Sequence, residues 1–294
     1  MKSLLPTVAG VRPSSRWLPA GSWKTVLDFL SEQYPQVEVE TWVARMARGE
    51  VIDENGLPID PGTLYRTGAC IFYYREVDDE KVIPYLEQVL YQDEHILVAD
   101  KPHFLPVIPS GKFLRQTLLV RLRQKYRLES LVPIHRLDRE TAGVVLFSTD
   151  AKTRGHYTAL FRTRKVRKVY EALAPTLNTA KFPTIRRSRI VRGEPFFRMQ
   201  EIRGEANSET EVSLIGNLGR NSLYQLIPVT GRKHQLRLHL ASLGIPIIND
   251  GLYPLISRPD ADDFSSPLKL LAKSLSFQDP LSGRQLYFES GMKL

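Results

Sequence analysis

The sequence predicts an α+β fold whose central sheet is mixed. Segments with strand character outnumber those with helical periodicity, and the two kinds do not alternate as they do in a doubly wound parallel fold. The chain has 294 residues, which is enough for a substantial core and for more than one domain. Hydrophobic residues make up 42% and charged residues 25%, the proportions of a soluble globular protein.

The N-terminal part of the chain predicts an arm followed by a small module. Residues 1–22 are rich in proline and carry only basic charged side chains, so we expect a flexible basic arm. A small α/β module is predicted for residues 23–76. Two helices, the second over residues 39–48, precede an Asn55-Gly56 turn between short apolar segments, which is a strong hairpin signal. An apolar strand at Cys70–Tyr74 closes the module.

A second, larger domain is predicted for residues 84–294. The acidic stretch of residues 77–81 is the best candidate for the linker before it. Strand character is found at residues 88–91, 95–100, 143–149, 168–173, 187–192, 208–215, 223–229, 268–277 and 285–288. Helical periodicity is found at residues 116–126, 151–161 and 231–243.

Composition excludes several classes of protein. Cys70 is the only cysteine, so no internal disulfide or cysteine metal site can form, and a reducing compartment is expected. His234 and His239 lie five residues apart, which is not the spacing of two ligands on one helix face, and we expect no bound metal. No apolar run approaches the ~18–20 residues that span a bilayer, and we expect a cytoplasmic protein without membrane contact.

The net charge indicates a polyanionic partner, with nucleic acid favoured over a membrane. The formal charge is +9, and the excess cations gather in a first basic cluster at residues 162–168 and a second basic cluster at residues 181–203. Phe196 and Phe197 lie inside the second cluster, where rings can stack on bases while arginines contact phosphates. A solvated basic face without a ligand is the alternative interpretation.

The most unusual segment is a charged loop, His135-Arg-Leu-Asp-Arg-Glu-Thr-Ala-Gly143, which runs into an apolar strand. Asp138 stands between Arg136 and Arg139, and nearby cations favour the ionised form of an aspartate. An acid held ionised is suited to act as a nucleophile or base. On this segment alone, a surface turn with a local ion pair is the alternative.

A second unusual segment runs from Thr230 to His239. Thr230 is expected to cap a helix whose first turn carries Arg232 and Lys233. Cations are disfavoured there, so an RNA phosphate or a protein carboxylate is expected nearby. Arg237 lies beside an apolar stripe and needs a carboxylate partner in the interior, for which Asp138 is the candidate. The alternative is that Arg237 reaches solvent along the helix surface.

Taken in order, these segments resemble the RluA-type pseudouridine synthases, a family of RNA uridine isomerases. The resemblance covers most of residues 88–290. It is carried by the motifs Tyr91-Gln-Asp-Glu-His-Ile-Leu-Val-Ala-Asp-Lys-Pro102, HRLDRETAG, Lys168-Val-Tyr170, Thr230-Gly-Arg-Lys-His-Gln-Leu-Arg-Leu-His239, Ala241-Ser-Leu-Gly-Ile-Pro246 with Asp250, and a final Leu-Leu-Ala-Lys-Ser-Leu-Ser-Phe277. The resemblance implies a mixed, mostly antiparallel central sheet with flanking helices and loops.

The resemblance also implies roles for individual residues. Asp138 would attack the target uridine covalently, at a position that residue identity leaves open. Tyr170 would stack on the flipped uracil and assist removal of the ring proton, and Arg237 would pair with Asp138. Arg136 would fill the space that the uridine leaves, and Leu236 would line the base pocket. Further substrate-binding candidates in the same motifs are His135, Thr141, Arg232 and His234.

The chain departs from the family pattern at several positions. Phe104 stands where many relatives have glycine, Ile108 and Leu271 stand where histidine is common, and Ala142 stands where serine is frequent. These changes spare the nucleophile and bear on contacts to the target loop. The N-terminal module resembles the alpha-L RNA-binding module, but its second helix offers few cations, so it either binds RNA or is degenerate.

We therefore expect an RNA pseudouridine synthase that isomerises specific uridines in a ribosomal or transfer RNA stem-loop. The reaction has no net redox change and no external nucleophile, so neither a metal nor an organic cofactor is expected, and a monomer without an obligate protein partner is the default. One alternative is a non-catalytic RNA-binding or ribosome-assembly protein on the same fold. Another is a carboxylate-based hydrolase, for which Glu140 is the only nearby candidate for a paired acid.

Overall fold

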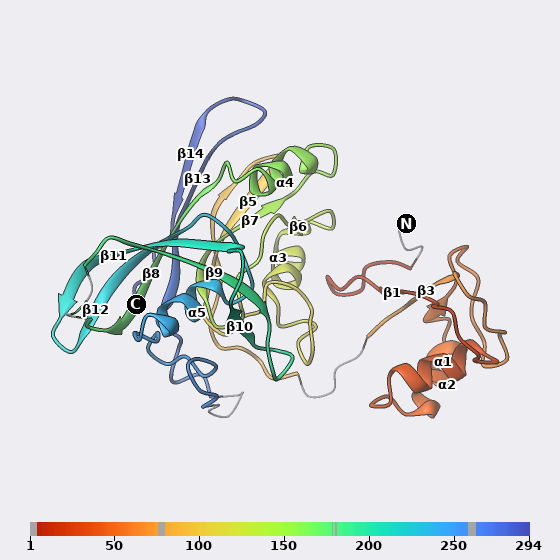
Figure 1. Cartoon of the computed structure of the whole chain (residues 1–294). Coiled ribbons are helices and arrows are strands. Elements are labelled where there is room, and N and C mark those ends of the chain that lie inside the picture. Colours follow the sequence, from red (N-terminus) through yellow and green to blue (C-terminus); the bar gives the residue numbers. More distant parts are fainter. Residues whose placement is uncertain (1–4, 76–79, 178, 180, 258–262) are drawn as a thin grey trace. The chain divides into compact units, whose positions relative to one another are not determined.

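The computed structural model divides the chain into two units (Figure 1). It describes residues 5–75, 80–177, 179, 181–257 and 263–294. The smaller unit comprises Met1–Glu80 and Gly111–Arg115, and the larger unit comprises Lys81–Ser110 and Gln116–Leu294. Most of the predicted linker at residues 77–81 lies outside the described residues.

The smaller unit is a three-stranded sheet with two helices. Its elements are β1 (Ser14–Trp17), α1 (Val26–Gln33), α2 (Val39–Ala47), β2 (Val51–Ile52) and β3 (Cys70–Tyr73). Thr25 begins α1 with a capping box, because its side chain accepts from the Asp28 N–H and the Asp28 side chain accepts from the Thr25 N–H. The predicted turn is confirmed, since Gly56 takes a φ of +83° and Asp53 N–H donates to Leu57 O.

The flexible arm predicted for residues 1–22 is wrong for its second half. Ser14–Trp17 forms β1 and pairs antiparallel with Cys70–Tyr73, and Leu18 is buried in the core of the unit. Proline and glycine content suggested an arm, but this short strand pairs with residues about 55 positions further along the chain. Local composition does not reveal such a partner.

The larger unit is built on a single sheet with three helices among its described residues. Its helices are α3 (Leu118–Tyr126), α4 (Arg154–Arg162) and α5 (Gln235–Ser242). Its strands are β4 (Gln88–Gln92), β5 (Ile96–Lys101), β6 (Val132–Pro133), β7 (Ala142–Ser148), β8 (Arg167–Pro175), β9 (Thr184–Arg192), β10 (Met199–Ile202), β11 (Ser208–Leu218), β12 (Asn221–Pro228), β13 (Leu270–Gln278) and β14 (Gln285–Glu289).

The predicted mixed, mostly antiparallel sheet is confirmed. The strand order is β10-β9-β11-β12-β8-β13-β7-β5-β4, with β14 beside β13 and β6 beside β7. The described pairings are antiparallel except for the short contact between β13 and β7. Each strand predicted between residues 88 and 288 is present, with boundaries shifted by a few residues, whereas β6 and β10 were not predicted.

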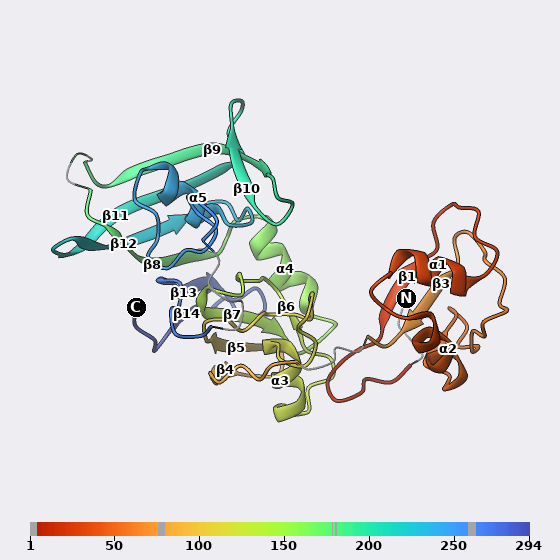
Figure 2. The same cartoon turned by 90° about the horizontal axis from the view of Figure 1, so that it is seen from below.

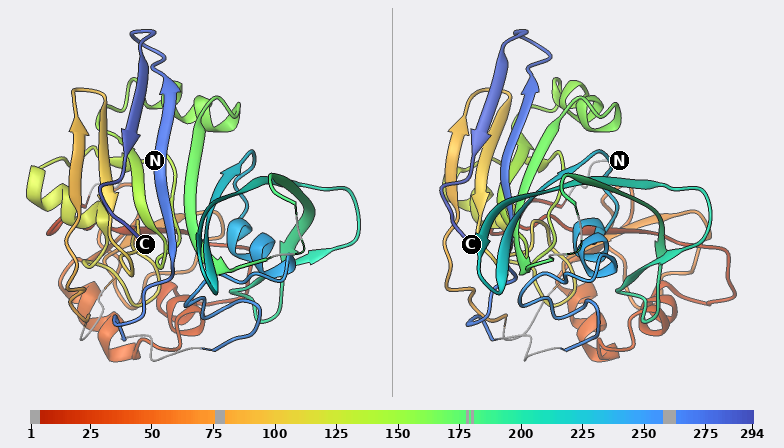
Figure 3. Two further views of the ribbon diagram at one scale, coloured as in Figure 1. Left: turned by 90° about the vertical axis from the view of Figure 1, so that its left-hand side faces the viewer. Right: turned by 60° about the vertical axis from the view of Figure 1, so that its left-hand side comes forward.

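The sheet has two halves with separate cores. β8 to β12 curl around α5, and Figures 2 and 3 show this helix inside the curve of the strands. The core there joins α5 to the inner face of these strands through Leu236, Leu240, Tyr224 and Leu226. A second core on β5, β7 and β13 holds α4 through Tyr157 and Leu160.

The contact between the two halves requires a glycine. Gly143 in β7 has a φ of +115°, and a Cβ atom there would lie 2.2 Å from the backbone oxygen of Ala272 in β13. Glycine alone allows this approach at this backbone conformation. Gly143 ends the charged loop, so the same residue fixes where that loop meets the sheet.

Candidate active site

The charged loop joins β6 to β7 in the larger unit, and its backbone is held by three separate donors. The Thr141 N–H donates to Asp138 O at 3.2 Å, and the Lys101 ammonium donates to Arg139 O at 3.0 Å. The His103 Nδ1–H donates to Glu140 O at 2.7 Å. Because three successive carbonyl groups are anchored in this way, the backbone around Asp138 is held in place before any ligand binds.

Lys101 is the buried support of this loop. Its side chain is fully buried, and its ammonium also donates to the carbonyl oxygens of Pro102 and Leu105, at 2.9 and 2.7 Å. Burial lowers the pKa of Lys101 to about 7, although the charges of Glu140 and Asp138 oppose that shift. Three carbonyl acceptors use all three ammonium protons, so Lys101 acts on the site through the backbone.

His135 begins the charged loop but is engaged with the protein. Its Nε2 accepts from the Leu146 N–H at 3.1 Å, and its ring stacks on Phe161 with centroids 4.7 Å apart. Burial, with a smaller effect from Lys168, lowers the pKa of His135 to about 3. The neutral ring therefore holds the loop against β7. These contacts of His135 are structural, whereas the sequence predicted that it binds substrate.

The helix that carries Arg237 begins later than predicted. α5 starts at Gln235, and its N-cap is His234 in the left-handed conformation, with a φ of +56°. Thr230 does not cap the helix as predicted, because its hydroxyl donates to Gln235 Oε1 and accepts from the Glu209 N–H. Arg232 therefore lies in the loop before the helix, and the expected cost of cations in the first turn does not arise.

Arg237 enters the interior as predicted, but its principal partner is Asp250. The side chain of Arg237 is 2% exposed. Its Nε and Nη2 donate to the two oxygens of Asp250 at 2.8 and 2.7 Å. Burial alone would lower the pKa of Arg237, but Asp250, Asp138 and Glu140 outweigh it and raise that pKa. The predicted ion pair between Arg237 and Asp138 is present at 3.7 Å, whereas the hydrogen bonds go to Asp250, which was not predicted as a partner.

Asp138 instead faces the remaining edge of the same guanidinium. Its Oδ2 lies 3.7 Å from Arg237 Nη1, a buried nitrogen that makes no hydrogen bond among the described residues. Its Oδ1 lies 3.9 Å from His234 Nε2. The Asp138 side chain is 26% exposed, so it is open to a ligand on one side and faces the Arg237 cation and the His234 ring on the other. This arrangement suits a carboxylate that attacks while ionised.

Glu140 is a second carboxyl group in the site, and it is held ionised. Its Oε2 lies 3.7 Å from Arg237 Nη1, and its Oε1 accepts from Arg139 Nε at 3.2 Å. Burial alone would raise the pKa of Glu140, but the charges of Arg237 and Arg139 outweigh it and lower that pKa. A carboxyl group in this state is a poor proton donor at neutral pH.

Tyr170 and Leu236 form the apolar side of the site. Tyr170 lies on β8 opposite Leu226 of β12 and packs against the core that contains Leu236. Burial raises the pKa of Tyr170, and the charge of Asp138 raises it further. The phenol therefore stays protonated at neutral pH and offers a ring face and an O–H donor, which does not favour the predicted help with proton removal.

The other predicted substrate contacts divide into buried and exposed groups. Thr141 is buried beneath the loop, and His234 is buried with its Nδ1 3.0 Å from the Tyr253 hydroxyl. Arg232 is exposed, although its Nε donates to Asn207 O at 3.2 Å. Arg136 is exposed and forms no ion pair among the described residues, so its guanidinium is available to RNA.

Two residues at the site, Asp250 and Tyr253, make contacts that the sequence did not predict. Asp250 appeared only as a position in the family resemblance, although it accepts four hydrogen bonds, two from Arg237 and two from the backbone N–H groups of Leu252 and Tyr253. The Tyr253 ring lies 5.6 Å from the guanidinium carbon of Arg237. An acidic residue in the motif Asn-Asp-Gly-Leu-Tyr, shortly after the helix, was the available signal.

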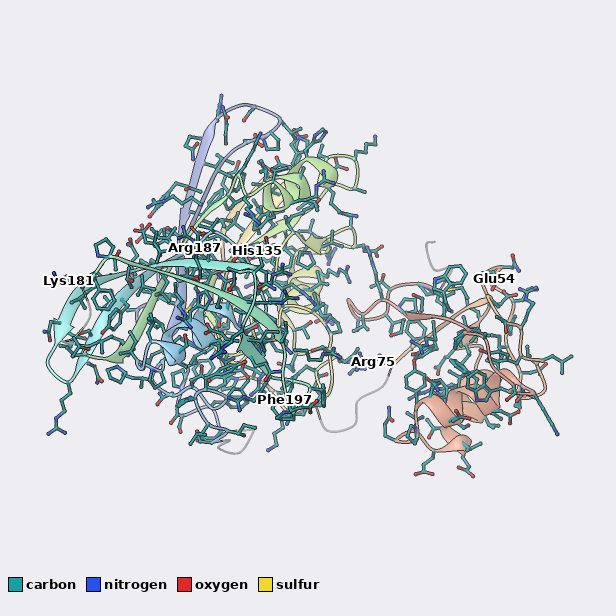
Figure 4. The ribbon with its side chains drawn as sticks, in the orientation of Figure 1. Glu54, Arg75, His135, Lys181, Arg187 and Phe197 are labelled. Atoms are coloured by element: carbon teal, nitrogen blue, oxygen red, sulfur yellow. The ribbon has the colours of Figure 1, made fainter. Side chains whose placement is uncertain are left out.

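The second basic cluster is partly used within the protein. Arg186 pairs with Glu201, Arg187 pairs with Glu209 at 2.8 Å, and Arg198 donates to Pro254 O. Figure 4 labels Arg187 on β9 and Phe197 near the β9–β10 turn. Phe196 at this turn is 72% exposed and is therefore open to stacking, whereas only part of the basic cluster is free for phosphates.

The described residues offer neither a metal site nor a helix that could span a membrane. Among them, no group of three or more histidine, cysteine or acidic residues could hold a metal ion. Within the same residues, no helix is both long and apolar enough to cross a membrane.

Comparison with known proteins gives consistent matches to one family. The sequence profile of a family described as RNA pseudouridylate synthase matches residues 95–242. An uncharacterized RNA pseudouridine synthase of Synechocystis sp. is 33% identical over 233 residues, covering 78% of this chain and 79% of that protein. The dual-specificity RNA pseudouridine synthase RluA of Haemophilus influenzae is 31% identical over 211 residues, covering 70% and 93%.

Solved structures agree on the fold. Human RNA pseudouridylate synthase domain containing 4 superimposes with a TM-score of 0.53 and 26% identity, covering 70% of this chain and 88% of that chain. Human RNA pseudouridylate synthase domain containing 1 gives a TM-score of 0.58 with 23% identity, covering 70% and 84%. The second likeness bears on the fold alone.

Proposed function

Because the chain belongs to the RNA pseudouridylate synthase family, we propose that it isomerises specific uridines of a ribosomal or transfer RNA stem-loop with Asp138 as the nucleophile. The observation that carries this proposal is the convergence of Asp138, Tyr170 and Arg237, which come from a loop, a strand and a helix. A protein that only binds RNA has no need of an aspartate beside a buried arginine. The non-catalytic alternative is therefore the weaker one.

The chemistry begins with a nucleotide turned out of its stack. Extrusion costs a few kcal/mol of unstacking. The exposed guanidinium of Arg136 can occupy the vacated space, and the ring of Tyr170 can receive the uracil against the apolar side chain of Leu236. These contacts offset the cost of extrusion and bring the ribose and uracil to the open side of Asp138.

Asp138 then supplies the electron pair for the covalent step. Arg237 Nη1 lies 3.7 Å from its carboxylate, so a negative charge there is stabilised without any hydrogen bond to Arg237 that would have to break before attack. The N-glycosidic bond breaks, the uracil rotates within the pocket, and a new bond forms between the ribose and a ring carbon. The bond between Asp138 and the nucleotide breaks again, the ring carbon loses its proton, and the ring nitrogen of the broken bond gains one. No atom is gained or lost in the net reaction, in keeping with the isomerase activity of the family.

The hydrolase alternative requires a second carboxyl group that donates a proton. Glu140 is the candidate that the sequence offers near Asp138, and its lowered pKa keeps it ionised beside Arg237 and Arg139. Glu140 is therefore not suited to donate that proton. This favours isomerisation over release of free uracil.

We also propose that recognition of the RNA uses the exposed residues near the β9–β10 turn and that the protein acts in the cytoplasm as a monomer. Phe196 is the most exposed aromatic ring on this hairpin, and the exposed side chains of Arg189 and Arg192 lie on the strand that leads to it. Arginines beside an exposed ring are suited to single-stranded or looped RNA.

The test compares total RNA from cells with and without the intact gene by pseudouridine mapping. A cell with Asp138→Asn in place of the natural chain is the matched arm, since the change removes the charge and keeps the shape. We expect one or a few pseudouridines to disappear in both the deletion and the Asp138→Asn strain, while RNA binding by the purified variant is kept. Pseudouridine at the natural level in the variant strain would refute the nucleophile assignment.

A further inference from the structure

Lys168 lies beside the proposed site and has no function in it so far. It is on β8 two residues before Tyr170, so both side chains leave the same face of the strand, with Cα atoms ~7 Å apart. Its Nζ lies 3.4 Å from Thr230 O, in the loop that leads to α5. One long hydrogen bond uses at most one of the three ammonium protons.

The surroundings of Lys168 are cationic and partly dry. Among the described residues Lys168 forms no ion pair, and it is partly buried. Burial lowers the pKa of Lys168, and the charge of Arg164 lowers it further. A partly desolvated ammonium without an anion is costly, and an arriving anion would relieve that cost.

The approach to Lys168 is open at Gly231. A Cβ atom at Gly231 would lie 3.9 Å from Lys168 Nζ, so the absence of a side chain leaves room there. On the other side is the charged loop, since Lys168 is close enough to His135 to lower the pKa of that imidazole. Lys168 therefore lies between the Thr230–Gly231 loop and the first residue of the nucleophile loop.

We propose that Lys168 binds a backbone phosphate of the nucleotide whose base lies against Tyr170. This inference rests on the proposed function, because it places the uracil at Tyr170. A phosphate joined to that nucleotide is the anion within reach of a cation two residues along the strand. The ammonium then gains a charge-assisted hydrogen bond and loses its uncompensated charge. The site is a single-phosphate site and does not depend on RNA sequence.

The test uses uridine 3′,5′-bisphosphate as the probe and uridine as the phosphate-free control, with binding followed by calorimetry or by nuclear magnetic resonance titration. We expect the parent protein to bind the bisphosphate at least ~10-fold more tightly than uridine, since tenfold corresponds to ~1.4 kcal/mol for one charged contact. Lys168→Met should remove this preference and leave uridine binding unchanged. Lys168→Arg should keep part of it.

Lys165→Met is the matched control. Lys165 belongs to the same first basic cluster, and the change removes the same charge from an exposed side chain. Its bisphosphate preference should stay within about twofold of the parent value. Lys168→Met should also melt at the parent temperature or above it, because a desolvated cation has been removed. Lys168→Gln is the second variant if methionine impairs folding.

The proposal is overturned if the parent binds the bisphosphate no better than uridine, or if a folded Lys168 variant keeps the preference. The proposed function is measured separately, by conversion of uridine in cellular RNA. If the parent converts uridine in RNA and Lys168→Met keeps the preference for the bisphosphate, the phosphate site is refuted and the proposed function stands. If the parent does not convert uridine but its preference for the bisphosphate depends on Lys168, the proposed function is refuted and the phosphate site stands.

Discussion

Replacing Asp250 by asparagine should destabilise the larger unit and lower its activity without changing Asp138. Asp250 is 1% exposed and accepts two hydrogen bonds from the Arg237 guanidinium, at 2.8 and 2.7 Å. Asparagine keeps the shape but removes the charge and offers only one acceptor oxygen. Arg237 would then be a buried cation whose nearest carboxylates, Asp138 and Glu140, are 3.7 Å from Nη1.

The magnitude follows from what remains near the guanidinium. Removing one partner of a buried pair costs ~3–5 kcal/mol when the other charge is left uncompensated. Because two further carboxylates stay within 3.7 Å of Arg237, we expect the lower end, about 3 kcal/mol, for Asp250→Asn. Arg237→Met should cost about 5 kcal/mol, since it leaves Asp250 buried without a cation. A loss of 3 kcal/mol corresponds to roughly 6–12 °C in melting temperature for a unit of this size.

The assay is urea unfolding of the parent, both single variants and the double variant, together with conversion of uridine in RNA. The double variant should cost less than the sum of the singles by at least ~1 kcal/mol, because both changes break the same contact. Glu209→Gln is the control, since it removes an exposed pair with Arg187 and should cost at most ~1 kcal/mol. Additive costs, or an Asp250→Asn variant that melts like the parent, would refute the coupling of these two side chains.

Three further outcomes are expected. Gly143→Ala should yield insoluble or unfolded protein, because its Cβ would meet Ala272 O at 2.2 Å, and a soluble variant with the parent melting temperature would contradict the close approach. Burial lowers the pKa of His135 to about 3, so only the unfolded chain takes up this proton as the pH falls from ~6.5. The free energy of unfolding should therefore fall by up to ~1.4 kcal/mol per pH unit. Urea unfolding of His135→Gln should show a shallower fall of that free energy with pH. Arg136→Ala should leave the melting temperature unchanged and raise KM for the RNA identified by mapping; an unchanged KM would remove Arg136 from the RNA contact.

The sheet of the larger unit could be predicted because its strands carry their signal locally. Buried strands such as Ile96–Lys101 and Ala142–Ser148 are continuous apolar runs, and they need no knowledge of their neighbours. Ser14–Trp17 and Met199–Ile202 were missed because they are short and only partly buried, and pairing with another strand defines each of them. The start of α5 was placed too early because Thr230 looks like a cap, whereas its hydroxyl bonds to a side chain and to a neighbouring strand.

The sequence could predict which residues lie near one another at the site, but not which of them form pairs. The sequence indicates that Arg237 enters the interior, because it lies beside an apolar stripe, and the structure confirms its burial. It does not indicate which carboxylate receives the guanidinium, since Asp138 and Asp250 are both compatible with a need for an anion. That choice depends on the turn after α5, where the backbone N–H groups of Leu252 and Tyr253 also orient Asp250.

The division of the Arg237 guanidinium between two aspartates has a chemical consequence. If Asp138 accepted two hydrogen bonds from Arg237, both of its oxygens would be engaged, and attack would first require breaking a strong buried pair. Asp250 takes that position instead and holds the guanidinium by two of its three nitrogens. The third nitrogen faces Asp138 at 3.7 Å, which is near enough to favour a negative charge and too far for a hydrogen bond. The cation beside Asp138 is therefore kept in place by another carboxylate, and both oxygens of Asp138 stay free of hydrogen bonds to Arg237.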